Sequence, residues 1–155
     1  MAVLLSARGI KKFDIQMFGY TMYGKGQKNN LERIRVNSMN GADAIVKCLE
    51  QEGVTTVYGY PGVAIAPFYN SILNSDIRTI LVRTEQNAAH AASGEARVAG
   101  HVGVCAVTSG PGATNLITGI ATAFADSIPI VCITGQVKSD DMVSDVFQEA
   151  DITDA

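Results

Sequence analysis

The sequence predicts an α/β fold in which helices cover both faces of a parallel sheet. Three observations support this prediction. Hydrophobic residues make up 47% of the 155 residues and charged residues only 17%. Apolar strand patterns alternate with helical patterns from residue 40 onward, and a glycine-rich loop joins one strand to the next helix. The composition favours about one packed domain, and it argues against disorder and against a nucleic-acid-binding surface.

Helices and strands are expected in alternating order after residue 40. Asn40 is a good N-cap for a helix over 40–52, and Gly53 is a suitable stop. The helix over 85–99 is rich in alanine, which gives a smooth face that another helix can approach closely. The remaining expected elements are strand 54–58, turn 59–62, helix 64–73, strand 77–82, strand 102–107, helix 113–125 and strand 129–134.

The run TSGPGATN at residues 108–115 is the most informative motif. Gly110 and Gly112 allow a positive φ or a close approach, and Pro111 fixes the path between them. Amides at the start of the following helix could then face a bound group, although a tight connection without a ligand explains this loop alone equally well. GYPG at 59–62 and RTEQ at 83–86 follow neighbouring strands. All three motifs are therefore expected at one edge of the sheet, where ligands of parallel sheets collect.

Residues 1–38 differ from the rest of the chain in charge. They contain seven Lys/Arg and two Asp/Glu, whereas residues 39–155 contain five and thirteen. The first segment also lacks sustained periodicity, so we predict a poorly ordered basic tail or a wrongly assigned leader, with Met39 as a candidate natural start. An organelle transit peptide, which would direct the protein to a plastid or mitochondrion, is the weaker alternative.

The cysteines and the apolar stretches bear on the cellular location. Three cysteines lie in apolar patterns, and they do not form the even-numbered set that is typical of a disulfide framework. This favours reduced core thiols in a cytoplasmic protein. The cysteines are Cys48, Cys105 and Cys132. The longest apolar stretch, 116–134, is interrupted by Asp126 and Pro129, so we expect no membrane span. His90 and His101 have no carboxylate or cysteine at ligand spacing. We therefore expect no metal site built from this chain.

The motifs resemble, in order and approximate spacing, those of acetolactate synthase catalytic subunits, which are thiamine-diphosphate enzymes. The resemblance runs from about residue 40 to residue 151 and corresponds to the pyrimidine-binding domain of that family. It implies that residues 39–155 form an incomplete pyrimidine-binding domain, without the middle and diphosphate-binding domains. It rests on GYPG at 59–62, EQ at 85–86, Gly94, AR at 96–97, TSGPGATN at 108–115, AD at 125–126, IP at 128–129, TGQV at 134–137 and FQEAD at 147–151.

The resemblance also implies an activity and its partners. A transferase of this family condenses pyruvate with pyruvate or 2-oxobutyrate in branched-chain amino-acid biosynthesis. Thiamine diphosphate would be the cofactor. Mg²⁺ and FAD are implied for the full-length enzyme but not for residues of this fragment, which we expect to be inactive alone. A homodimer or higher oligomer through this domain and a regulatory subunit of the full-length enzyme are implied as well.

Individual residues match functional positions of the family. Glu85 matches the carboxyl group that hydrogen-bonds the aminopyrimidine ring, so that the ring's amino group becomes a local base. Gln148 matches a polar residue that reaches the active site, and Phe147 an aromatic wall of the substrate channel. A structural role is the alternative for each of them; Glu85, for example, would complement the helix dipole. The residues matching cofactor-binding positions are Tyr60, Pro61, Gly62, Glu85, Thr108, Pro111 and Asn115.

Several positions depart from the family pattern. Thr84 stands in place of His beside Glu85, Val63 in place of Gly, and Glu95 in place of Tyr. Val143 and Val146 replace small residues before Phe147. Val63 would be strained if its backbone needed a positive φ, and Glu95 could place an unpaired charge at a subunit contact. Two alternatives therefore stay open: a noncatalytic interaction module with a degenerate site, and a different thiamine-diphosphate carboligase.

Overall fold

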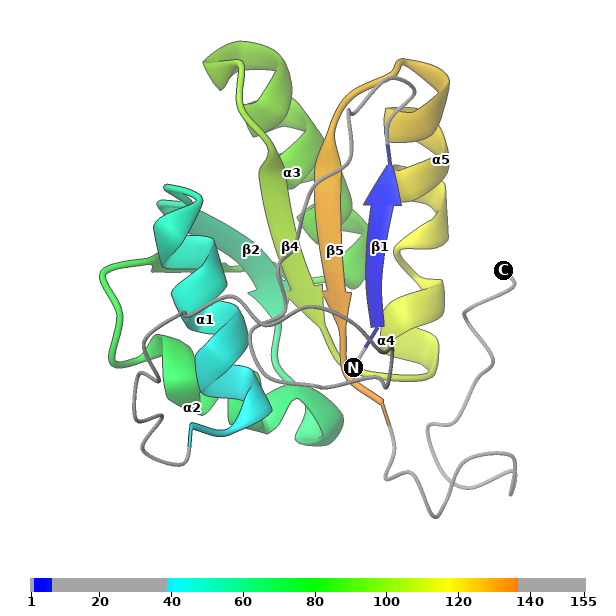
Figure 1. Ribbon diagram of the computed structural model, residues 1–155. Coiled ribbons are helices and arrows are strands. Elements are labelled where there is room, and N and C mark those ends of the chain that lie inside the picture. The colour runs from blue at the N-terminus through cyan, green and yellow to red at the C-terminus, as the bar shows by residue number, and fades with distance from the viewer. Residues whose placement is uncertain (1, 7–38, 137–155) are drawn as a thin grey trace, which may run out of the picture.

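Figure 1 shows the computed structural model of the chain, which describes residues 2–6 and 39–136. Five strands form one sheet in the order β1-β5-β4-β2-β3. The pairs β2–β3, β2–β4 and β4–β5 are parallel, whereas β1 runs antiparallel to β5. The predicted parallel sheet is confirmed, with one antiparallel edge strand added. The strands are β1 (Ala2–Ser6), β2 (Thr56–Tyr60), β3 (Arg78–Leu81), β4 (Gly103–Val107) and β5 (Ile130–Thr134).

Helices cover both faces of this sheet, as predicted (Figure 1). On one face α1 (Gly41–Gln51) and α2 (Ala66–Ile72) bury their apolar residues, together with the 3-10 turn η1 (Val63–Ile65) that precedes α2. On the other face lie α3 (Glu85–Ala99) and α5 (Ile117–Ala125). The short helix α4 (Pro111–Thr114) connects β4 to α5.

Alternate residues of β4 serve the two hydrophobic clusters. Val104 and Ala106 pack with the cluster under α1 and α2, whereas Cys105 and Val107 pack with the cluster under α3 and α5. All five residues of β4 are buried. This is the burial expected of a central strand in a parallel sheet that is covered on both sides.

The signals at the ends of α1 act as predicted. The Asn40 side chain accepts a hydrogen bond of 2.9 Å from the backbone N–H of Asp43, which satisfies one free donor of the first turn. After the helix, Gly53 adopts a φ of +73°. Glycine takes this left-handed conformation without steric cost, so the chain can reverse toward β2.

Two predicted helices are divided in the structure. The helix expected over 113–125 is replaced by α4 and α5, and the helix expected over 64–73 begins with a 3-10 turn at Val63. In the first case Pro111 begins the helix two residues earlier than expected, because proline is well tolerated in a first turn. The N–H of Leu116 then bonds the carbonyl of Ala113 in a tighter turn, which separates the two helices.

Strand β2 extends into the predicted turn. Gly59 and Tyr60 pair with Ala106 and Val107 of β4. A Cβ atom on Gly59 would collide with the hydroxyl of Tyr69 and the carbonyl of Ala106, which are joined by a hydrogen bond of 2.8 Å. This glycine therefore serves close packing within a strand, which its residue type alone could not reveal.

The prediction of a poorly ordered tail is wrong for Ala2–Ser6. These five residues pair along β5, from Ala2 opposite Thr134 to Ser6 opposite Ile130. The physical reason is the edge of β5, whose backbone N–H and C=O groups need partners that an apolar extended segment can supply. Residues 7–38 lie outside the described residues, so the rest of that expectation remains a prediction.

The alanine-rich face of α3 allows the close helix contact that was predicted. Ala88, Ala89 and Ala92 are fully buried. On α5, a Cβ atom added to Gly119 would collide with the Cβ of Ala89. The contact between α3 and α5 therefore depends on small side chains from both helices. In the described ranges no helix is long and apolar enough to cross a membrane.

Replacing Gly119 by Ala tests this contact. The added methyl group has no room beside Ala89, so we expect the free energy of unfolding to fall by about 1–3 kcal/mol. Gly94→Ala on α3 is the matched control, because its new methyl group would meet no atom within 4 Å. That variant should gain about 0.5–1 kcal/mol. Urea unfolding followed by circular dichroism measures both changes, and a stability loss shared equally by the two variants would contradict the close contact.

Candidate functional site

Three loops meet at the carboxyl ends of the parallel strands, as the motif positions predict. The turn after β2 contacts the loop after β4, since a Cβ on Gly62 would lie 2.5 Å from the Cβ of Thr108. That loop in turn contacts the start of α3. A Cβ on Gly112 would lie 2.7 Å from Thr108 Cγ2 and 3.5 Å from Glu85 Oε1. The structure thus brings GYPG, Glu85 and TSGPGATN into one site.

Glu85 is the acidic group of this site. It is the first residue of α3 and follows an extended Thr84. The Asn115 side chain donates a hydrogen bond of 3.0 Å from Nδ2 to Glu85 Oε2, across thirty positions of sequence. The half-buried carboxylate is therefore held by a neutral donor and lies at the positive end of the helix dipole. This position also fits the structural alternative, so the catalytic role of Glu85 stays a prediction.

Two hydroxyl groups of the site are buried without a hydrogen-bond partner. They are Thr108 Oγ1 and Ser109 Oγ, on residues that are 7% and 1% exposed. A buried polar group left unpaired costs about 1–3 kcal/mol. A water or a bound molecule can supply the missing hydrogen bonds. Sequence reasoning assigned Thr108 but missed Ser109, whose only signal was its place inside TSGPGATN.

The glycines of the β4 loop have different roles. Gly110 has a φ of +58° and a ψ of −124°, which a residue with a side chain rarely adopts. Gly112 is buried and leaves room for Thr108 and Glu85. Both roles, positive φ and close approach, are those expected of these two positions. Pro111 is exposed and begins α4, and Asn115 directly follows that helix.

The remaining predicted residues divide into placed and unplaced ones. Tyr60 ends β2 and is 40% exposed, and Pro61 is exposed beside it. The site therefore opens to the surface on this side. Gln148 and Phe147 lie outside the described residues, as does Val143, so their predicted roles remain predictions.

Val63 is one of the departures from the family pattern that the structure describes. Val63 is 85% exposed in η1. Its φ is not positive, because Ser127 is the non-glycine residue with a positive φ in the described part of the chain. The expected strain at Val63 is therefore absent.

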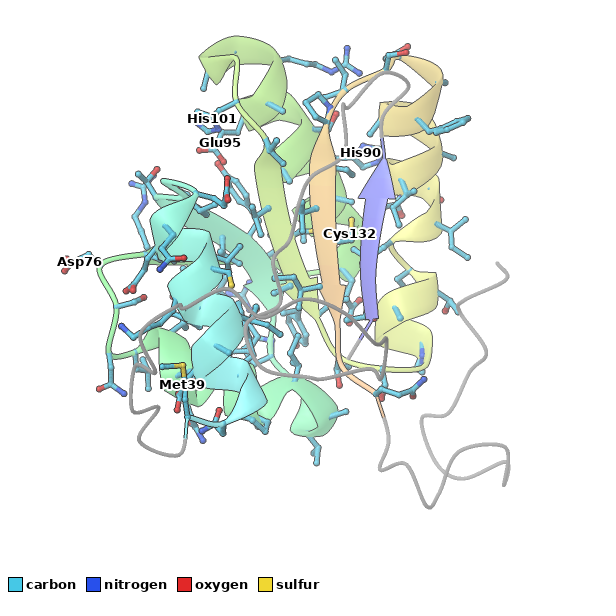
Figure 2. The ribbon with its side chains drawn as sticks, in the orientation of Figure 1. Met39, Asp76, His90, Glu95, His101 and Cys132 are labelled. Atoms are coloured by element: carbon cyan, nitrogen blue, oxygen red, sulfur yellow. The ribbon has the colours of Figure 1, made fainter. Side chains whose placement is uncertain are left out.

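Glu95 is another such departure. Its Oε1 lies 4.0 Å from His101 Nε2, and Figure 2 shows the two side chains together. Desolvation, followed by the charge of Glu95 and its hydrogen bond to the tyrosine, raises the pKa of Tyr58. Glu95 therefore has polar neighbours within the chain, and its expected place at a subunit contact stays a prediction. Glu95 lies about 15 Å along α3 from Glu85, given a rise of about 1.5 Å per residue.

Possible metal ligands and a hollow in the described part of the chain also bear on this site. Within the described ranges no group of three or more His, Cys, Asp or Glu residues could hold a metal ion. A hollow of about 290 Å³ lies between α1 and α2, away from the three loops. It is lined by Met39, Asp43, Val46, Lys47, Glu50, Ser71, Asn74 and Ser75.

Several known proteins are similar in sequence to this domain. A probable acetolactate synthase large subunit of Methanocaldococcus jannaschii is 58% identical over 113 residues, 73% of this chain and 19% of the relative. The acetolactate synthase isozyme 2 large subunit of Escherichia coli is 54% identical over 114 residues, 74% of this chain and 21% of the relative. An acetolactate synthase of Mycobacterium bovis is 51% identical over 121 residues, 77% of this chain and 20% of the relative.

The chain thus spans about a fifth of the length of the curated relatives it matches. A family model also matches residues 39–155, and its description is "Thiamine pyrophosphate enzyme, N-terminal TPP binding domain". The match includes all three loops of the candidate site. The chain therefore belongs to the thiamine pyrophosphate enzymes and carries their N-terminal TPP binding domain.

Proposed function

We propose that this chain is the pyrimidine-binding part of an acetolactate synthase that joins pyruvate to pyruvate or to 2-oxobutyrate. The observation that carries the proposal is the Glu85 carboxylate, held by Asn115 where three loops meet. Acetolactate synthase subunits more than 50% identical to this domain support the choice of reaction.

The site fits the polar edge of an aminopyrimidine ring. Glu85 offers carboxylate oxygens. The methyl group of Thr108 lies near this carboxylate at Gly112, whereas the buried hydroxyl of Thr108 lies beside Gly62. Gly62 and Gly112 keep side chains out of the space around Thr108. When bound, thiamine diphosphate would supply a carbon nucleophile after its thiazolium ring loses a proton. Thr108, Tyr60, Pro61, Pro111 and Asn115 would surround the cofactor.

Glu85 would act by holding a proton that it shares with a ring nitrogen. Such a proton-sharing group works only if its oxygen stays at a fixed position. Asn115 supplies that constraint, because its amide occupies Oε2 at 3.0 Å. Oε1, on the side of Gly112, would then be the oxygen that faces the ring. Gln148 and Phe147 are proposed to reach the substrate from the following segment.

The open side of the site supports completion by a further protein surface. Tyr60, Pro61 and Asn115 are all exposed there, and the relatives are about five times as long as the matched domain. We propose that another part of the enzyme, in a homodimer or larger oligomer, holds the diphosphate, Mg²⁺ and FAD. We also propose that the full-length enzyme binds a regulatory subunit and lies in the cytoplasm.

Replacing Glu85 by Gln in the gene product at its natural length tests the catalytic role. The amide cannot share a proton in the same way, so acetolactate formation should fall about 10²- to 10⁴-fold. Glu95→Gln is the matched control, since it makes the same change on the same helix far from the site. Turnover is measured by acetolactate production, and folding by circular dichroism. Unchanged turnover in Glu85→Gln would favour the noncatalytic interaction module.

Replacing Asn115 by Ala tests its positioning role. A hydrogen bond to a charged group contributes about 1.5–3 kcal/mol, so kcat should fall about 10- to 100-fold. The Michaelis constant for pyruvate should change much less. Asn74→Ala, an exposed position after α2, is the control. A weakened pyruvate affinity with unchanged kcat would indicate that Asn115 does not position Glu85.

The 155-residue chain by itself should show no turnover and only weak cofactor affinity. Our reason is that the proposed diphosphate and metal contacts come from another part of the enzyme. Titration calorimetry with thiamine diphosphate and Mg²⁺ measures this affinity. Micromolar binding to the chain alone would contradict the proposed division of the site.

A further inference from the structure

Two cysteines lie opposite each other in the centre of the sheet. Cys105 on β4 and Cys132 on β5 are paired in register, and their Sγ atoms are 3.3 Å apart. Both residues are 0% exposed, and both are free thiols. The mechanism proposed for the site does not use them.

We propose that Cys105 and Cys132 are a latent redox site that closes to a cross-strand disulfide when the helical layer above it opens. The spacing of paired strands is compatible with the bond. Neighbouring strands are about 4.7–4.9 Å apart, and a disulfide accepts Cα separations of about 4.4–6.8 Å. The sulfurs need only close from contact distance to about 2 Å. Side-chain rotation can supply this movement.

Burial keeps the pair unreactive in the closed domain. The hydrogen bond to Cys132, followed by burial, raises the pKa of Cys105 well above its usual range. Thiolate is the attacking species in disulfide exchange, so little of it is present in the folded state. Ala88, Ala89 and Ala92 of α3 and Ala123 of α5 belong to the same buried cluster and cover the pair. Oxidation therefore has to follow separation of this layer from the sheet.

The oxidant would be a small disulfide of the glutathione type. One cysteine thiolate attacks a sulfur of the oxidant, which forms a mixed disulfide and releases one reduced thiol. The second cysteine thiolate then attacks the protein sulfur of that mixed disulfide, which forms the Cys105–Cys132 bond and releases the second reduced thiol. The two protons of the protein thiols end on the two released thiols.

The position of the pair connects this chemistry to the candidate site. Cys105 lies on β4, three residues before Thr108, which directly follows that strand. At the end of β5, the N–H of Gly135 donates a hydrogen bond of 2.9 Å to the carbonyl of Val107. A bond between β4 and β5 would therefore restrain the strand that carries the TSGPGATN loop.

Oxidation of the 155-residue chain with Cys48→Ser tests the proposal, because these 155 residues then retain only the two paired thiols. The protein is incubated with glutathione disulfide, and the remaining thiols are alkylated and counted by intact mass. In buffer both thiols should stay reduced for long periods. In urea below the unfolding transition, both should be lost together without bound glutathione, and dithiothreitol should restore them.

Two helix variants test whether layer opening controls the rate. Gly119→Ala loosens the α3–α5 contact and should accelerate disulfide formation about fivefold to 100-fold, whereas Gly94→Ala should slow it or leave it unchanged. Equal rates in the two variants would overturn the opening step. Stable glutathione adducts on either cysteine, or two thiols that remain reduced in urea, would overturn the disulfide itself. All variants in these tests keep Cys105 and Cys132, so the outcome does not depend on whether a protein without either cysteine can fold.

Discussion

The candidate site depends on one steric constraint, the contact of two glycines with Thr108. A Cβ on Gly62 or on Gly112 would lie 2.5 Å or 2.7 Å from atoms of the Thr108 side chain. A side chain at either glycine would keep the turn after β2 or the start of α4 away from Thr108. Because Gly112 also borders Glu85, the same contact determines how closely the acidic group lies to the loop. Backbone packing therefore positions the site, and the hydrogen bond from Asn115 only orients the carboxylate within it.

The sequence could predict the layers of the fold because each layer leaves a local pattern. Alternating strands and helices, the Asn40 cap and the alanines of α3 are all readable within a few residues. Two of the failures depend on contacts distant in sequence. Gly59 reads as a turn, but it belongs to a strand because Tyr69 and Ala106 occupy the space a side chain would need. The pairing of Ala2–Ser6 with β5 was likewise hidden, because an edge strand is defined by the partner it finds.

The same distinction applies to the site. Motif spacing could place Glu85 and Asn115 at one sheet edge, since the carboxyl ends of parallel strands lie together. It could not show that the Asn115 amide donates to Oε2 and leaves Oε1 toward Gly112. Nor could it show that Ser109 is buried without a partner, because burial of a single hydroxyl has no periodic signature. The geometry thus adds a direct contact between two residues to which the resemblance gave different roles, Glu85 as a catalytic and cofactor-binding residue and Asn115 as a cofactor-binding residue.

The departures from the family pattern do not weigh equally against catalysis. Val63 is exposed and unstrained, and Glu95 has polar partners far along α3, so neither change disturbs the loops around Glu85. Thr84 is different because it directly precedes Glu85 as the N-cap of α3, yet its side chain makes no capping hydrogen bond. Its backbone is extended, a conformation common to N-cap residues, so α3 still begins at Glu85. A change at this position can therefore alter what lies beside the carboxylate while the carboxylate keeps its place. The departures at Val63, Thr84 and Glu95 therefore leave the start of α3 and the contacts of Glu85 in place.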